Sequence, residues 1–243
     1  MKLDDVKKLK QKKYREQFGC FLVEGEHLIL ELFKAAKTSQ KLQQSELFYT
    51  EQYAEWLQAH NPLNLRSTLV SEKAMKQISG TLSPQGIVAA VPFLTFEPNQ
   101  QSKAVYLHEI QDPGNLGTII RTLGWFGGFR LFLSPNSVDP YNPKVVRASM
   151  GAIFHVSFVS GVSLADVQQT HPRMAYLDMQ GEPIKSESFH DFDCYAFGNE
   201  ARGVPTNELV DANATAFTIP GSQQIESLNL ATAVNLCVYE LKR

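Results

Sequence analysis

Apolar and polar positions alternate along this chain in short segments that differ in period. FLV at 21–23 is an apolar run of the length expected for a buried strand, and the EHLILELFKAA segment after it spaces its apolar residues as one helix face does. Strand and helix patterns continue through SELFYT, EQYAEWLQAH, STLVSEKAMKQISG and QGIVAAVPFL. The first part of the chain therefore predicts a small α/β module.

The alternation restarts in the second half of the chain. We expect helices in the segment that ends at Gly127 and Gly128, in the segment from Lys144 and in LNLATAVNLCVYEL, and strands in AVYLHEI, RLFLS, FHVSFV, MAYLDM, CYAFG and AFTIP. Strands that alternate with helices imply a parallel sheet covered on both faces. Residues 95–102 contain little that can be buried and predict a linker. The predicted domains are therefore 1–95 and 102–243.

Composition supports a folded protein with a local basic segment. The chain has 243 residues, 43% of them hydrophobic and 20% charged, which is enough to bury a sizeable core. A formal net charge of −2 argues against coating nucleic acid by bulk electrostatics. The N-terminal segment nevertheless forms a basic arm suited to phosphates, with Lys12, Lys13 and Arg15 as candidate RNA-binding residues. A solvated helix face is the alternative interpretation of this pattern.

Targeting and metal signals are weak in this sequence. The lysine-rich N-terminus lacks the apolar centre of a signal peptide, and no run of about 18 apolar residues predicts a membrane span, so we expect a soluble cytoplasmic protein. Cys20, Cys194 and Cys237 are far apart and are expected to be reduced core residues. The six histidines show no ligand spacing, so no metal site is predicted.

Three polar segments follow predicted strands, where parallel sheets place their active sites. DPGNLG follows AVYLHEI, GNEARG follows CYAF, and PGSQQIESLN follows AFTI. None matches GxGxxG or a P-loop, which argues against a nicotinamide-dependent oxidoreductase. Arg121 stands within an apolar helical run, where arginine is rarely buried unpaired, and a side chain that snorkels to solvent is the alternative.

Helix capping is a competing explanation for three of the other polar residues. Asn115 stands where a helix begins and is a candidate N-cap. Ser227 is expected to cap the last helix, with Asn229 in its first turn. Glu200 has the alternative role of a solvated loop acid.

Together, the three segments resemble the signatures of the SpoU (TrmH) family of RNA ribose 2'-O-methyltransferases, in the SPOUT superfamily. NLGTIIRT carries Asn115 and Arg121, FGNEARG carries Glu200, and IPGSQQIESLNLATA carries Ser227 and Asn229. Gly221 and Gln223 stand where members often have methionine and glycine. KKYREQFGCFLVEGEHLILEL resembles the small substrate-binding domain of many members, which is similar to ribosomal RNA-binding proteins of the kink-turn class.

The resemblance implies a fold and a set of binding partners. It implies an α/β catalytic domain with a parallel sheet and a C-terminal trefoil knot, preceded by a small α/β RNA-binding domain, in a homodimer. S-adenosylmethionine is the implied cofactor. Its contacts are expected mainly from backbone groups around Phe197, Gly198, Asn199, Ile219, Pro220 and Leu228.

The resemblance also implies roles for the signature residues. Arg121 would clamp a substrate phosphate and stabilise alkoxide character, Asn115 would orient Arg121 or the ribose, and Glu200 would pair with Arg121 or position the hydroxyl. Ser227 and Asn229 would lie in a loop that contacts cofactor and substrate. The implied reaction is methyl transfer to a ribose 2'-hydroxyl, with ribosomal RNA preferred over transfer RNA. A non-catalytic RNA-binding or ribosome-assembly factor is the alternative of a different class.

Overall fold

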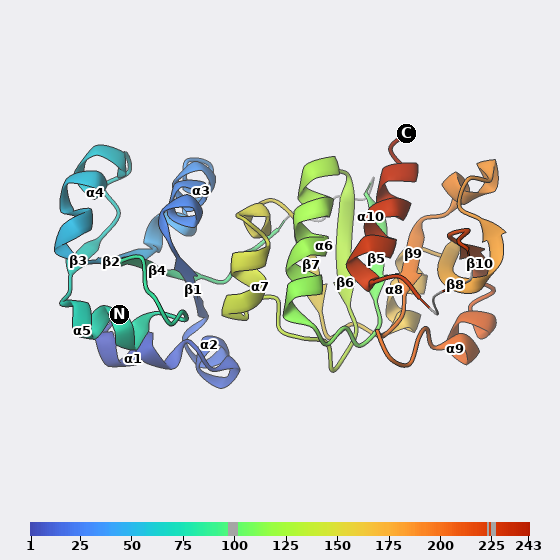
Figure 1. Cartoon of the computed structure of the whole chain (residues 1–243), viewed down its shortest axis with the longest axis horizontal. Coiled ribbons are helices and arrows are strands. Elements are labelled where there is room, and N and C mark those ends of the chain that lie inside the picture. The colour runs from blue at the N-terminus through green and yellow to red at the C-terminus, as the bar shows by residue number, and fades with distance from the viewer. Residues whose placement is uncertain (97–101, 223, 225–226) are drawn as a thin grey trace. The chain divides into compact units, whose positions relative to one another are not determined.

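The computed structural model describes residues 1–96, 102–222, 224 and 227–243, and Figure 1 shows it with its elements labelled. The chain forms two compact units. Unit 1 comprises Met1–Thr95 and Asp139–His155, and unit 2 comprises Phe96–Val138 and Val156–Arg243. Most of the expected linker, at 97–101, and Gln223 lie outside the described residues.

Unit 1 is built on a four-stranded mixed sheet with the order β1-β4-β2-β3. Strands β1 and β2 both pair antiparallel with β4, whereas β3 pairs parallel with β2. The strands are β1 (Cys20–Glu24), β2 (Glu46–Tyr49), β3 (Ser67–Leu69) and β4 (Ile87–Pro92), and the helices are α1 (Leu3–Lys8), α2 (Lys12–Phe18), α3 (Glu26–Ala36), α4 (Ala54–His60) and α5 (Glu72–Ile78). One core cluster joins Leu22, Phe48 and Val88 of the sheet to α1 and α5, so the predicted α/β module is present.

A segment from the second half of the sequence completes unit 1. It contains α7 (Pro143–Ala148) and comes from within the range predicted for the second domain. The Tyr141 ring lies 4.6 Å from the Phe21 ring of β1 and stacks on Phe93 at 4.3 Å between centroids. Asp139 accepts a 2.9 Å hydrogen bond from Arg15 Nε. These contacts join residues that are far apart in the sequence, 124 positions for Arg15 and Asp139, which is why local periodicity does not predict them.

Unit 2 contains a six-stranded sheet with the order β10-β8-β9-β5-β6-β7, and every neighbouring pair is parallel. The predicted parallel sheet is therefore confirmed. The strands are β5 (Lys103–Leu107), β6 (Phe129–Leu133), β7 (Ser157–Ser160), β8 (Met174–Pro183), β9 (Cys194–Phe197) and β10 (Thr215–Thr218). The helices are α6 (Pro113–Phe126), α8 (Leu164–Thr170), α9 (Thr206–Asp211) and α10 (Leu230–Glu240).

The helices of unit 2 pack against its sheet and are joined to the strands by loops. Helices α6 and α10 lie side by side, while residues of α8 and α9 share a core cluster with Tyr106 and Ala196 of the central strands (Figure 1). Helix α6 begins directly after the loop that follows β5, and it ends at Gly127, which has φ +63°. The polar segments singled out in the sequence therefore follow β5, β9 and β10, which is where such sheets bind ligands.

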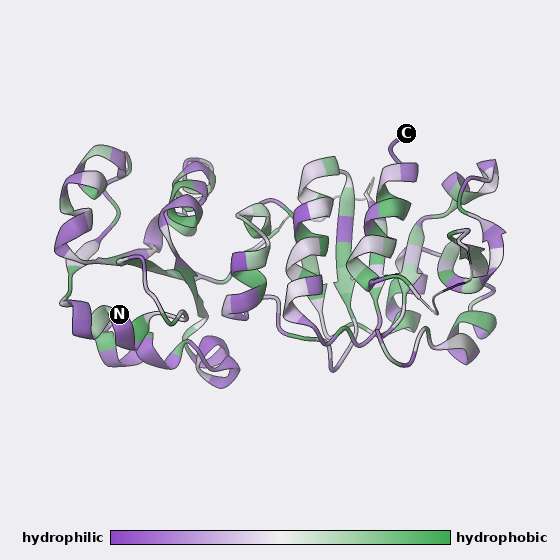
Figure 2. Ribbon diagram, viewed as in Figure 1, coloured by the Kyte–Doolittle hydropathy of each residue, from purple (hydrophilic) through white to green (hydrophobic). Residues whose placement is uncertain are grey.

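The distribution of apolar residues follows the sheets. Figure 2 shows apolar residues concentrated along the central strands of unit 2, whereas its helices mix polar and apolar positions. Across the described ranges, none of the helices combines the length and apolar character needed to cross a bilayer.

Candidate active site

The first turn of α6 is capped by Asp112. Its Oδ1 accepts a 2.7 Å hydrogen bond from the backbone N–H of Asn115, and Pro113 occupies the first helical position. Proline suits that position because its missing N–H would have no partner there. The alternative interpretation of Asn115, as the N-cap of this helix, is therefore wrong. Its side chain is left to make contacts outside the helix.

The Asn115 side chain joins the three sequence signatures. Its Nδ2 donates to Glu200 Oε1 at 3.1 Å, and its Oδ1 accepts from Asn229 Nδ2 at 2.9 Å. The three residues come from α6, from the loop after β9 and from the start of α10. We call them the Asn115–Glu200–Asn229 cluster. Such a chain of contacts fixes both the amide orientation and the spacing of the three loops.

Glu200 is held by the start of α6. Besides Asn115, its carboxylate accepts hydrogen bonds from the backbone N–H groups of Gln111 and Asp112, each at 3.3 Å. A negative charge is favourable at a helix N-terminus, where N–H groups lack intrahelical partners. Among the described residues Glu200 makes no ion pair with Arg121, so the structure does not contain that expected pairing.

The start of α10 corrects the second capping prediction. Asn229, and not Ser227, is the N-cap of this helix, because its Oδ1 accepts from the backbone N–H of Thr232 at 3.2 Å. Ser227 is exposed and makes no hydrogen bond to another residue of the described chain. Asn229 therefore both caps α10 and contacts Asn115, which ties the position of this helix to the cluster.

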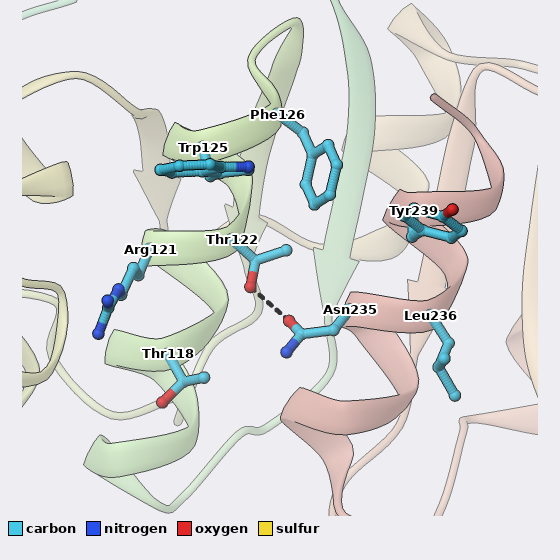
Figure 3. Close-up of a pocket in the computed structure, with 8 residues that line it drawn as sticks. All are labelled: Thr118, Arg121, Thr122, Trp125, Phe126, Asn235, Leu236 and Tyr239. Atoms are coloured by element: carbon cyan, nitrogen blue, oxygen red, sulfur yellow. Dashed lines mark hydrogen bonds between the residues drawn. The ribbon is translucent and has the colours of Figure 1, made fainter. Parts of the chain in front are cut away.

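Arg121 lies on the exposed face of α6, two turns beyond the cluster. Figure 3 shows it with Thr118, Thr122 and Trp125 on one side of a groove between α6 and α10. Thr122 Oγ1 donates a hydrogen bond across this groove to Asn235 Oδ1. Arg121 itself has no hydrogen bond or ion pair within the described part of the chain. The arginine is thus not buried in a core helix.

The loop after β9 has a closed and tightly packed shape. Phe197 ends the strand in the core, and a Cβ added at Gly198 would lie 2.1 Å from the carbonyl carbon of Gly203. Asn199 and Gly203 exchange backbone hydrogen bonds of 2.9 Å. The buried Asn199 side chain also accepts from the backbone N–H groups of Ala201 and Arg202. These contacts fix the loop in one shape, which only a glycine at 198 allows.

The loop after β10 is open by comparison. Ile219 is partly buried, Pro220 is exposed, and Leu228 is 43% exposed. Within the described residues, Gly221 and Leu228 make no backbone hydrogen bond. The described residues Ile219–Gly221 and Leu228 therefore offer peptide groups and apolar surface. Such groups fit the adenine and methionine portions of S-adenosylmethionine, which a site can hold through its backbone.

Glu109 and Gln111 also belong to this region, although neither lies in one of the three polar segments. Glu109 accepts hydrogen bonds from the loop after β9, and Gln111 donates its backbone N–H to Glu200. A signal for them was present, because both stand directly between a strand and the DPGN turn.

The candidate RNA-binding residues fall into two groups. Lys12 and Lys13 are exposed on α2, where Lys12 lies 3.8 Å from Glu16 and Lys13 lies over the Tyr14 ring. Arg15 is 2% exposed, and its Nη1 donates to the carbonyls of Leu9 and Lys10 in addition to the Asp139 pair. Arg15 is therefore a buried structural residue of unit 1, and the bonds that its guanidinium makes within the chain argue against the predicted role as an RNA ligand.

The cysteines are remote from this chemistry. Burial raises the pKa of the Cys194 and Cys237 thiols far above its usual range, which keeps both protonated. Burial also raises the pKa of the half-buried Cys20 thiol. No group of three His, Cys, Asp or Glu side chains in the described ranges is arranged to hold a metal ion.

Comparisons with known proteins extend these observations. Residues 102–239 match the model of the SpoU rRNA Methylase family, and residues 2–89 match that of the MRM3-like substrate binding domain. The chain is 30% identical to the 23S rRNA (guanosine(2553)-2'-O)-methyltransferase RlmP of Bacillus subtilis, over 99% of this chain and 96% of that protein.

Two solved structures share the fold along nearly the whole chain. An AdoMet-bound rRNA methyltransferase of Sinorhizobium meliloti superposes with a TM-score of 0.80 at 25% identity, covering 98% of this chain and 93% of that one. The methyltransferase AviRb of Streptomyces viridochromogenes, in complex with AdoMet, gives a TM-score of 0.83 at 21% identity over 98% and 96% of the two chains, a likeness of fold.

Proposed function

The chain belongs to the SpoU rRNA methylase family, and on this premise we propose that it methylates a ribose 2'-hydroxyl of ribosomal RNA. The observation that carries the proposal is the Asn115–Glu200–Asn229 cluster, in which three distant signatures meet through side-chain hydrogen bonds. The enzyme uses S-adenosylmethionine, which supplies an electrophilic methyl group when bound. The loops around Phe197–Asn199, Ile219–Pro220 and Leu228 would hold it.

The reaction is an in-line displacement. The ribose oxygen forms a bond to the methyl carbon while the carbon–sulfur bond breaks, and the hydroxyl proton must leave. Positioning the two reacting groups supplies much of the required rate. The cluster fixes the loops on which these groups would rest. We propose that Ser227, which is exposed in the loop before α10, contacts RNA or cofactor.

Arg121 supplies positive charge rather than a proton acceptor. A guanidinium stays protonated at any physiological pH, so it is a poor base. It has five donors and, within the described chain, no partner for them, which suits it to bind an RNA phosphate and to stabilise negative charge on the attacking oxygen. A phosphate of the substrate can accept the hydroxyl proton. Lys12 and Lys13 add phosphate contacts from unit 1.

We also propose that the enzyme is a homodimer that pairs through the face formed by α6 and α10. Trp125 is 84% exposed there, and Tyr239 and Leu236 are also exposed. Large apolar side chains grouped on one face favour a protein interface over free solvent. Arg121 lies on the same face, and water excluded by a second copy would strengthen the electrostatic interactions of its guanidinium.

Two further proposals follow from family membership. The C-terminal part of unit 2, which ends in α10, is proposed to form the trefoil knot that the sequence resemblance implies. A cytoplasmic location is proposed because assembling ribosomes are the source of the substrate. Both can be checked independently of the chemistry.

The proposed function is tested by labelled methyl transfer from S-adenosylmethionine to ribosomal and transfer RNA from cells that lack the protein. Ribose methylation leaves the adjacent phosphodiester resistant to alkali, so the label should appear in alkali-stable dinucleotides of the ribosomal fraction. Label in the mononucleotides that alkali releases would indicate base methylation and contradict the proposal. Binding of RNA with no binding of cofactor would favour the non-catalytic RNA-binding factor.

A further inference from the structure

Glu109 has an unusual backbone conformation directly after β5. Its φ is +48°, in the left-handed region that residues other than glycine seldom adopt. This conformation presents its carbonyl oxygen to the loop after β9, where Asn199 Nδ2 donates to it at 2.7 Å. Gln111 Nε2 donates to the same oxygen at 3.0 Å. Backbone strain of this kind persists only where surrounding contacts hold it, and it often marks functional sites.

The Glu109 side chain and N–H contact two further segments. Its Oε2 accepts from Arg202 Nη2 at 2.7 Å, and its Oε1 accepts from Asn136 Nδ2 at 3.4 Å. Its backbone N–H donates to Ser134 Oγ at 2.6 Å. Glu109 therefore connects the loops after β5, β6 and β9. Through Asn199 and Arg202 it holds both ends of the closed segment 199–202.

We propose that Glu109 is a positioning residue for the cofactor, which acts by holding the loop after β9 in its binding shape through Asn199 and Arg202. The inference rests on the proposed function, because that loop is one of those assigned to S-adenosylmethionine. Glu109 holds the loop through hydrogen bonds to Asn199 and Arg202, and it belongs to none of the three family signatures described above. It explains why a carboxylate with a left-handed backbone stands at the end of a central strand.

The exposure of the Glu109–Arg202 ion pair indicates how a substitution of Glu109 should affect stability and cofactor affinity. The Arg202 side chain is 72% exposed and the Glu109 side chain is 20% exposed. Such a pair contributes little to folding because water already solvates the guanidinium. The contact with the buried Asn199 is made to the Glu109 backbone carbonyl, so it depends on the positive φ and is retained when only the Glu109 side chain is changed. Substitution of the Glu109 side chain removes its contacts with Arg202 and Asn136, and it should therefore alter the loop and the cofactor affinity more than the overall stability.

The test is calorimetric titration of S-adenosylmethionine into the full chain and its variants. Glu109→Ala, which removes the contacts with both Arg202 and Asn136, should weaken cofactor binding about tenfold, and Arg202→Ala, which removes only the first of them, about threefold. The exchanged pair Glu109→Arg with Arg202→Glu should recover most of the affinity lost by either single charge reversal. Glu187→Ala, which alters an exposed carboxylate of unit 2, should leave the affinity unchanged.

Steady-state kinetics separate positioning from a general loss of structure. With Glu109→Ala or the milder Glu109→Gln, KM for the cofactor should rise while kcat at saturation stays within about twofold. Amide hydrogen exchange in the 199–204 loop should increase, and RNA affinity should not change. If the wild-type protein binds cofactor and the Glu109 variants bind it with the same affinity, this inference is overturned and the proposed function is not. Wild-type protein that binds no cofactor would overturn the proposed function as well.

Discussion

The first and third turns of α6 differ in whether their polar side chains have hydrogen-bond partners within the chain. In the first turn, the Asn115 amide has a partner on each polar atom, Glu200 on one and Asn229 on the other. In the third turn, Arg121 extends its guanidinium into solvent with no partner in the described chain. Both residues belong to the same sequence signature, so sequence alone does not separate their roles.

The difference indicates a division of work along one helix. Groups that are satisfied inside the chain position loops, and their loss affects geometry. A cation without an internal partner is available to bind something that the chain does not contain, here an RNA phosphate or a second subunit. The predictions below test this division, from the largest expected effect to the smallest.

Arg121→Ala should have the largest effect. Removing the only charge proposed to act on the reacting oxygen should lower the single-turnover rate of methyl transfer about a thousandfold, at the upper end for loss of one stabilising donor. Cofactor affinity should stay within about twofold. Arg121→Lys should restore only part of the rate, since lysine cannot make the forked contact to phosphate. An alanine variant with the wild-type rate would remove Arg121 from the mechanism.

Leu236→Asp should separate the proposed dimer. A charge placed on the α6–α10 face would be buried without a partner on assembly, and we expect the dissociation constant to rise about a hundredfold. Light scattering at micromolar concentration should then report the monomer mass. Val210→Asp is the matched control, because Val210 is also exposed in unit 2 but lies on α9. A wild-type chain that is monomeric would contradict the proposed interface.

Asn115→Ala should have a smaller effect on rate, of about tenfold, because it breaks two neutral or charge-assisted contacts without removing a reacting group. Asn229→Ala alone should cost a similar amount. If the cluster works as one unit, the double variant should lose little more than either single variant. Fully additive losses in transfer rate would show that the two asparagines act independently.

The same distinction between satisfied and free side chains applies to α2. Lys12→Ala and Lys13→Ala should each weaken RNA binding about twofold. Each should also reduce the slope of log affinity against log salt concentration by about one.

Arg15→Ala should instead destabilise folding by about 3 kcal/mol, because it leaves the mostly buried Asp139 carboxylate without its cationic partner. Denaturant unfolding and filter binding distinguish the two. Loss of RNA affinity in a fully stable Arg15 variant would contradict this assignment.

The sequence predicted the helices and strands of unit 2 better than their caps. The run NLGTIIRT with Gly127 and Gly128 correctly indicates α6, and each expected strand of the parallel sheet is present. The local pattern does not identify the N-caps, because Asn115 and Ser227 satisfy it as well as Asp112 and Asn229 do. At α6, Pro113 was the available clue to the first helical position.

Features that depend on distant contacts were beyond local patterns. Arg15 lies in a lysine-rich segment that is typical of a solvated basic face, but its guanidinium is buried and pairs with Asp139, which is 124 positions away. Glu109 was missed for a related reason. Its importance comes from a positive φ and from contacts with two other loops, neither of which a sequence pattern encodes.

The central claim is tested most directly by mapping 2'-O-methylated riboses in ribosomal RNA from three strains of the source organism. One strain carries the wild-type chain, one lacks it, and one carries Arg121→Ala. We predict that a ribose methyl group present in the first strain is absent from both others, while the variant protein is folded and binds cofactor. Identical maps in all three strains would contradict the account.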